Sequence, residues 1–175
     1  MRDREPKQHC RPQGGVRKAQ ARAQRLNKIK DMFVFQCYSG MAFKDMSNLC
    51  KTDIYTDDNG RQYITKERAK TGITYTVLLL PKAIEILEKY DYKLPCCSNV
   101  KMNAYLKEIA DVCHIPINLH SHCGRHTAAT MFLNAGLSIE VVAKILGHSS
   151  TRITQQTYAK MLDKTVINAM ATLNI

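Results

Sequence analysis

The segment from His120 to Tyr158 contains four side chains whose chemistry suits a phosphodiester. His122 and Arg125 lie three residues apart, and His148 ends a Leu-Gly-His run. Arginine presents a planar fork that fits two phosphate oxygens. Histidine moves a proton near neutral pH, and tyrosine forms covalent intermediates. Together, these residue types are able to bind and cleave a phosphodiester without a metal ion.

The spacing of these residues adds to the chemistry of each. At the start of a predicted helix, His122 and Arg125 can face one phosphate together. Taken alone, the pair would be interpreted as a helix-start histidine and a surface arginine. The downstream His148 and Tyr158 favour catalysis instead. No tyrosine other than Tyr158 follows Tyr105, so the sequence offers no rival nucleophile in this region.

This order of motifs resembles the C-terminal signature of the tyrosine recombinases, the phage-integrase type of site-specific DNA recombinase. The H-x-x-R pair, the Leu-Gly-His run and a tyrosine followed by Ala-Lys occur in the order of that family. The resemblance is strong from His120 to Lys160 and weaker from about Leu26 onwards. The interval from His148 to Tyr158 is one residue longer than the usual family spacing, which predicts a differently shaped tyrosine loop.

The resemblance implies a role for each residue. Tyr158 would attack a DNA phosphate, giving a 3′-phosphotyrosyl link and a free 5′ hydroxyl. Arg125, His122 and His148 would stabilise the transition state, and either histidine would take the tyrosine proton. Lys70, beside a predicted β-turn, matches the hairpin lysine that protonates the leaving 5′ oxygen. Because the phosphotyrosine keeps the bond energy, the resemblance implies no ATP, metal or other cofactor.

One departure from the family concerns its first catalytic arginine, at whose position this chain has Ala42. Arg68 is the best substitute in the sequence. It precedes Lys70 by two residues, and residues two apart in a strand share a face. The alternative for Arg68 is an ordinary exposed strand residue.

A metal site is a second interpretation of the histidines, because His122 and His126 are one helical turn apart and His120 and Cys123 are near. The sequence has no C-x-x-C, and the second ligand pair of a structural zinc site is missing. We therefore predict no metal site, and we expect His126 to pack and hydrogen-bond within the domain.

A different class of function is a non-catalytic DNA-binding protein or a helix-turn-helix regulator. The segment 135–148 has the helices and small residues of such a motif, whose second helix reads the major groove. That interpretation gives no reason for Tyr158 or for the upstream strands.

The predicted fold is α+β and mainly helical, with a small three-stranded antiparallel sheet. Strands are predicted at residues 53–56, 61–68 and 73–80, separated by turn signals. Helices are predicted before and after these strands in the sequence, with Ser98 and Ser138 as N-caps. They cover residues 26–40, 43–49, 82–90, 100–113, 125–136, 138–147 and 163–173. By resemblance this is the catalytic domain of a DNA breaking-rejoining enzyme.

Charge and length set the domain organisation. The chain has 175 residues and a net charge of +11, of which residues 1–30 carry +8 and residues 31–175 only +3. DNA binding by the folded part therefore needs a local patch. We predict a basic, disordered tail or linker at residues 1–24, and the catalytic domain at residues 25–175. The resemblance implies an N-terminal clamp domain, for which we expect no room within these 175 residues.

Composition and resemblance also bear on location and partners. Seven cysteines, with no signal peptide before them, indicate free thiols in a reducing cytoplasm. No apolar run approaches membrane-spanning length. The resemblance implies double-stranded DNA as partner, and a homo-oligomer, a tetramer, in a synaptic complex on that DNA.

Overall fold

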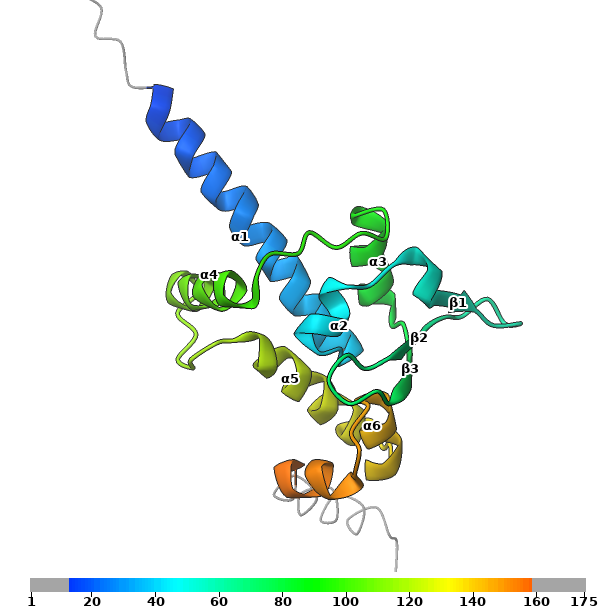
Figure 1. Cartoon of the computed structure of the whole chain (residues 1–175). Coiled ribbons are helices and arrows are strands. Elements are labelled where there is room, and N and C mark those ends of the chain that lie inside the picture. Colours follow the sequence, from blue (N-terminus) through cyan, green and yellow to red (C-terminus); the bar gives the residue numbers. More distant parts are fainter. Residues whose placement is uncertain (1–12, 159–175) are drawn as a thin grey trace, which may run out of the picture.

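A computed structural model describes residues 13–158 of the chain (Figure 1). Ten helices and strands have assigned bounds within this part. They are α1 (Gln13–Ser39), α2 (Phe43–Ser47), the 3-10 helix η1 (Lys51–Asp53), β1 (Ile54–Thr56), β2 (Gln62–Glu67), β3 (Thr74–Leu78), α3 (Pro81–Lys89), α4 (Asn99–Val112), α5 (Ser121–Asn134) and α6 (Ile139–Ile145). Residues 151–158 are also helical.

The three strands form one antiparallel sheet in the order β1-β2-β3. Ile64 pairs with Ile54 on one side and with Val77 on the other. Side chains alternate between the faces of a strand, and in β3 the buried positions are Tyr75 and Val77. The predicted mainly helical fold with a small three-stranded antiparallel sheet is confirmed.

Two groups of buried apolar side chains hold the domain together. The larger lies among α1, α2, the sheet, α3 and α4, and Phe35, Ile64 and Leu106 are fully buried in it. The smaller joins α5 and α6 and includes Tyr158 from the helix at 151–158. The proposed nucleophile is therefore part of the packing that fixes the C-terminal helices.

Helix α5 crosses α1 closely at Gly124, the residue before Arg125. A Cβ atom at Gly124 would lie 3.0 Å from Cβ of Gln36 and 3.3 Å from the ring of Phe33. Because no larger residue fits without movement, the glycine allows the helices to approach at this point. This close approach fixes the position of Arg125 relative to α1.

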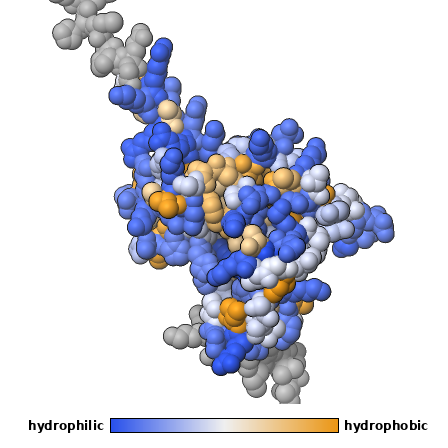
Figure 2. Space-filling model, viewed as in Figure 1, coloured by the Kyte–Doolittle hydropathy of each residue, from blue (hydrophilic) through white to orange (hydrophobic). Residues whose placement is uncertain are grey.

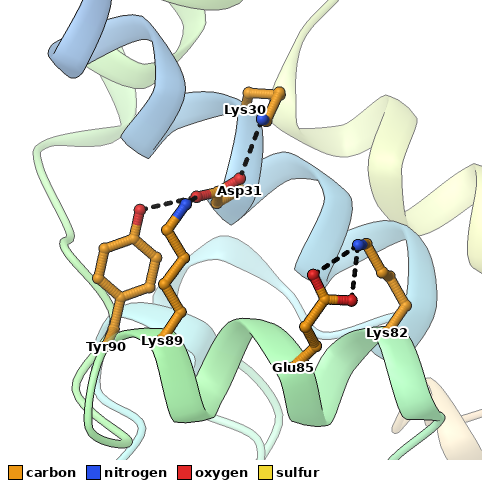
Figure 3. Close-up of polar contacts among 6 residues, drawn as sticks. All are labelled: Lys30, Asp31, Lys82, Glu85, Lys89 and Tyr90. Carbon is orange, nitrogen blue, oxygen red and sulfur yellow. Dashed lines mark hydrogen bonds and ion pairs between the residues drawn. The ribbon is translucent and has the colours of Figure 1, made fainter.

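A buried carboxylate ties α1 to α3 (Figure 3). Asp31 is 6% exposed, and its Oδ2 accepts hydrogen bonds from Lys89 Nζ at 2.5 Å and Tyr90 Oη at 2.8 Å. Burial alone would raise the pKa of Asp31, but these hydrogen bonds outweigh it and hold that pKa below its ordinary value. The ion pair between Lys82 and Glu85, by contrast, lies on the exposed side of α3.

Helix α1 extends well beyond the body of the domain (Figure 1), and most side chains on the visible face of its outer part are hydrophilic (Figure 2). Arg25 donates to Tyr105 Oη on α4 at 3.0 Å, and Arg22 pairs with Glu108. Residues 13–24 form the first part of α1, so the prediction of a disordered tail is wrong over these residues. The division of the chain at residue 24 stays a prediction.

Local signals placed several elements correctly. Oγ of Ser98 accepts the backbone N–H of Lys101 at the start of α4, and Oγ of Ser138 accepts that of Val141 at the start of α6. Both predicted N-caps are confirmed. The helix predicted at residues 163–173 lies outside the described residues. Among the described helices, none is both long and apolar enough to cross a membrane.

Candidate active site

A cleft of about 360 Å³ opens between the C-terminal helices and the turn that follows β2. The predicted site residues in its lining come from four separate parts of the sequence: the segment after β2, α5, the loop after α6 and the helix at 151–158. All six predicted site residues line it. They are Arg68, Lys70, His122, Arg125, His148 and Tyr158. The remaining lining residues are Thr71, His126, Ser149, Ile153 and Thr157.

Arg125 is the most constrained cation of the cleft. It is 5% exposed, and its Nη1 donates to the carbonyl oxygen of Gly40 at 2.9 Å while Nη2 donates to that of Leu146. Burial, with the nearby positive charge of Arg68, lowers its pKa to about 10, so it remains a cation at neutral pH. Two backbone segments thus hold the guanidinium in place, and donors not used in these bonds are left for a ligand.

Arg68 reaches the same cleft from the sheet. Its Nη1 donates to the carbonyl oxygen of Gly147 at 2.8 Å, directly before His148 in the chain. Gly147 has a positive φ of 61°, and a Cβ atom there would lie 3.2 Å from Cδ of Arg68. The glycine therefore gives the room in which the arginine side chain lies. Nε of Arg68 is buried without a hydrogen-bond partner among the described residues.

The prediction that Arg68 and Lys70 lie on one face of a strand is wrong. Strand β2 ends at Glu67, and residues 69–71 form a turn in which the N–H of Gly72 donates to the carbonyl oxygen of Arg68 at 2.9 Å. The two side chains nevertheless line one cleft. The turn that closes the hairpin, and not the alternation of a strand, brings them together.

The turn is anchored to α2 by Asp45. The N–H of Ala69, between the two cations, donates to Oδ1 of Asp45 at 2.9 Å. Asp45 is 2% exposed. A buried carboxylate that accepts a backbone N–H from the turn fixes where the turn lies.

A smaller cavity of about 210 Å³ adjoins Ala42. Its lining includes Ala42, Arg68, His122 and Arg125. The short side chain of Ala42 thus faces a space that it shares with Arg68. Arg68 therefore lies beside Ala42, the position at which the resemblance to the tyrosine recombinases leads us to expect an arginine.

The histidines of the cleft are in their neutral form at pH 7. Burial, followed by the charges of Arg125 and Arg68, lowers the pKa of His148 to about 4. Burial and the neighbouring His126 and Arg125 lower the pKa of His122 as well. Nδ1 of His148 lies 2.8 Å from Oγ1 of Thr154, which fixes the orientation of the ring.

Tyr158 lies in the cleft although its interval from His148 is one residue longer than usual. Its side chain is 6% exposed, and burial raises the pKa of the phenol despite the opposing effect of Arg125. Its Oη lies 2.8 Å from Nδ1 of His126. The ring of His126 makes an edge contact with that of His122, with centroids 4.4 Å apart.

The sequence interpretation did not foresee this contact of His126 or the backbone anchors of the arginines. The expected hydrogen bond of His126 within the domain is present, but its partner is the proposed nucleophile. Position gave a signal: His126 follows Arg125 and lies one helical turn after His122, so it shares a face with the latter. The backbone carbonyls that hold the two arginines could not be predicted, because every residue type has the same carbonyl group.

The cleft is suited to an anion. Its lining contains the cations Arg68, Lys70 and Arg125 and no carboxylate. Cations such as Arg68 and Arg125, which are at least partly buried, attract a phosphate more strongly than fully exposed cations. Within residues 13–158, no group of three or more metal-ligating side chains is placed to hold a metal ion.

Known proteins similar to this chain include recombinases and transposases. Residues 95–165 match the phage integrase family. A tyrosine recombinase of Thermosipho africanus is 29% identical over 147 residues, which cover 78% of this chain and 50% of that protein. Transposase B from transposon PsiTn554 of Staphylococcus aureus is 35% identical over 159 residues, covering 78% of this chain and 25% of that protein.

Solved structures share the fold. The XerH site-specific recombinase bound to a palindromic difH substrate matches with a TM-score of 0.63 and 16% identity, covering 88% of this chain and 51% of that chain. The Tn1549 transposon integrase in complex with transposon right end DNA matches with a TM-score of 0.61 and 16% identity, covering 99% of this chain and 68% of that chain.

The fold is thus that of the catalytic domains of tyrosine recombinases. The resemblance of this chain to the tyrosine recombinase or phage integrase family is confirmed. The matched segment contains His122, Arg125, His148 and Tyr158, whereas Arg68 and Lys70 precede it. The chain spans half the length of the Thermosipho relative and a quarter of the staphylococcal one.

Proposed function

We propose that this chain cleaves and rejoins DNA strands in site-specific recombination, with Tyr158 as nucleophile. The observation that carries the proposal is that Tyr158 shares one cleft with two arginines, a lysine and two further predicted histidines. Oη would attack the phosphorus and form a 3′-phosphotyrosyl link, while the 5′ oxygen leaves. The 5′ hydroxyl of a partner strand would reverse the step.

The charge of each group in the cleft indicates its role in the proposed reaction. Arg125 and Arg68 would bind the non-bridging oxygens, whose charge grows in the transition state. Neutral His122 and His148 would donate hydrogen bonds to the same oxygens. Lys70, on the exposed turn, would give its proton to the leaving 5′ oxygen.

Arg68 is proposed as the replacement for the arginine that Ala42 lacks. Both residues line the small cavity, and Nε of Arg68 is a buried donor without a partner among the described residues. An unsatisfied buried donor costs about 1–3 kcal/mol. A phosphate oxygen in the cleft would accept from it and relieve that cost.

The partner proposed for this cleft is double-stranded DNA. The matched XerH structure is a complex with a difH substrate, and the matched Tn1549 integrase structure is a complex with transposon right end DNA. On DNA, we propose a homo-oligomer, a tetramer that holds two duplexes, acting in the cytoplasm. The basic outer part of α1 supplies charge that favours association with a polyanion.

The test is a covalent adduct on a suicide substrate. A pool of nicked duplexes of random sequence, from which the cleaved fragment diffuses away, traps the intermediate without knowledge of the target site. We expect a protein–DNA band that survives denaturation and maps to Tyr158. Tyr158→Phe removes the nucleophile and should abolish the band, with DNA affinity almost unchanged.

The matched control is Tyr55→Phe, because Tyr55 is a surface tyrosine of β1 with 47% exposure. It should form the adduct as the parent does. An adduct that persists in Tyr158→Phe, or maps to another residue, would refute the assignment. Tight sequence-specific binding without any adduct would instead support a non-catalytic DNA-binding protein.

A further inference from the structure

We propose that His126 is the general base of the cleft, the group that accepts the proton of Tyr158 as its oxygen becomes a nucleophile. This inference rests on the proposed function of Tyr158. The sequence motifs pointed to His122 or His148 for this step. Neither of those two has a hydrogen bond to Tyr158 in the structure, whereas His126 does.

The contact has the geometry of a proton transfer. Nδ1 of His126 and Oη of Tyr158 are 2.8 Å apart, within the range of 2.6–3.2 Å expected for a base and its proton donor. The two rings meet edge to face, with centroids 5.7 Å apart. His126 lies on α5 and Tyr158 on the helix at 151–158, so the contact also joins these elements.

The surroundings keep His126 in the form that a base requires. Its pKa lies below the ordinary value, first because of burial and then because of His120 and Arg125. The other ionisable groups that face it are His122, through the edge contact, and Tyr158 itself. These neighbours are neutral or cationic, so none of them favours the imidazolium. At pH 7, His126 is uncharged, and in the Nε2–H tautomer its Nδ1 is free to accept.

The proposed step balances in atoms and charge. The O–H bond of Tyr158 breaks, its proton moves to Nδ1 of His126, and the electron pair of the oxygen forms the new bond to phosphorus. The bond from phosphorus to the leaving 5′ oxygen breaks, and that oxygen takes its proton from Lys70. In rejoining, the imidazolium of His126 returns the proton to the departing phenolate.

The hydrogen bond matters most because Tyr158 is a weak nucleophile in this position. Burial raises the pKa of its phenol, so very little phenolate exists at pH 7. A base in contact with the hydroxyl removes the need for prior ionisation. General base catalysis contributes about 10²–10⁴-fold to a rate.

The experiment measures the reactivity of Tyr158 without DNA. A fluorophosphonate probe, whose phosphorus takes the tyrosine oxygen and releases fluoride, reports the rate of labelling at Tyr158 by peptide mass spectrometry. The variant is His126→Asn, because the asparagine amide can keep a hydrogen bond near the position of Nδ1 but accepts no proton. His114→Asn is the control, since His114 is an exposed histidine outside the cleft.

We expect labelling at pH 7 to fall about 10²-fold or more in His126→Asn, and to stay at the parental rate in His114→Asn. The pH profile separates a base from a structural support. In the parent, the rate should level off once His126 is neutral. In His126→Asn it should rise tenfold per pH unit, because only phenolate reacts. A parental rate or a parental profile in His126→Asn would overturn the proposal.

A second measurement applies even if that variant fails to fold. An NMR titration follows the pKa of His126 in the parent and in Tyr158→Phe. The tyrosine hydroxyl donates to the neutral ring and so favours the neutral form, and its loss should raise the pKa of His126. An unchanged pKa would overturn the proposal. Neither readout depends on DNA, so a missing DNA adduct would count against the proposed function and not against the His126 assignment.

Discussion

The two walls of the cleft hold their functional groups in different ways. On the helical wall, formed by α5, the end of α6 and residues 151–158, Arg125 and Tyr158 are 5% and 6% exposed and hydrogen-bonded to other elements. On the sheet wall, Arg68 is partly buried and donates to the carbonyl oxygen of Gly147, whereas Lys70 is exposed on the turn. The helical wall combines proposed catalytic groups with packing, whereas Arg68 and Lys70 add charge without being part of the apolar core.

Because of this difference, substitutions on the two walls should differ in how much they change stability as well as activity. A change to Arg125 or Tyr158 removes both a proposed catalytic group and hydrogen bonds between elements. A change on the sheet wall should cost less stability, because Arg68 donates to one carbonyl oxygen and the hairpin is held by backbone pairing between β2 and β3 and by the Asp45 contact.

Arg125→Ala should have the largest effect, because it removes a transition-state donor and leaves the carbonyls of Gly40 and Leu146 without their donor. Cleavage of the suicide substrate should fall by at least about 10²–10³-fold. Each buried carbonyl left unsatisfied costs about 1–3 kcal/mol, so the free energy of unfolding in urea should also fall. Arg125→Lys should restore stability only in part, since an ammonium lacks the fork.

The control for this variant is Arg152→Ala, an exposed arginine on the helix at 151–158. Its free energy of unfolding should stay within about 0.5 kcal/mol of the parent. Full parental stability of Arg125→Ala would contradict the view that the helical wall joins catalysis to packing.

Arg68→Ala should lower the rate strongly and the stability by less than Arg125→Ala does, because it removes one hydrogen bond, to the carbonyl oxygen of Gly147. Losing one donor to the transition state typically costs about 10²–10³-fold in rate. Arg68→Lys should rescue cleavage only partly, because a lysine cannot bind two oxygens in the planar geometry of arginine. Urea denaturation and suicide-substrate cleavage, measured on the same samples, separate the two effects.

Arg61→Ala is the matched control, because Arg61 is an exposed arginine at the other hairpin turn, paired with Asp57. It should cleave at the parental rate. Parental cleavage by Arg68→Ala would mean that the cleft works with Arg125 as its single arginine.

Acid should destabilise the helical wall through its histidines. The folded pKa of His148 is about 4, below its ordinary 6.5, so the unfolded chain binds more protons between these values. The stabilising contribution is therefore complete above pH 6.5 and is lost as the pH falls towards 4. The urea midpoint should fall over this interval, and less steeply in His148→Asn than in the parent. If the urea midpoint of His148→Asn falls with pH as steeply as that of the parent, His148 is not the source of the acid sensitivity. His114→Asn is the control and should behave as the parent does.

The smallest expected effect is that of a chelator, which should change nothing. Both walls contribute cations where a metal-dependent nuclease has carboxylates. Cleavage in EDTA should match cleavage in buffer. An activity that is lost in EDTA and recovers with added Mg²⁺ or Zn²⁺ would overturn the mechanism.

Local rules predicted much of the fold and the identity of the cleft residues. The caps at Ser98 and Ser138 follow from side chains that satisfy nearby backbone N–H groups. The strands follow from turn signals and β-branched runs. The H-x-x-R, Leu-Gly-His and tyrosine motifs could be identified in the sequence because each spans a few residues and they occur in a fixed order.

Other features lay beyond such rules because they depend on contacts between distant segments. The sequence suggested that Arg68 and Lys70 share a strand face, but β2 stops at Glu67 and a turn presents both. His126 was expected to bond within the domain, yet nothing in its neighbourhood named Tyr158, 32 residues later, as the partner.

By itself, then, the sequence determined the residue types of the cleft and the elements that carry them, since these depend on interactions over a few residues. Only the tertiary structure decided which donors and acceptors meet. The carbonyls of Gly40 and Leu146 hold Arg125 because α5 packs on α1 at Gly124 and α6 returns beside it. Backbone carbonyls are chemically alike in every residue, so no residue pattern could have singled these two out.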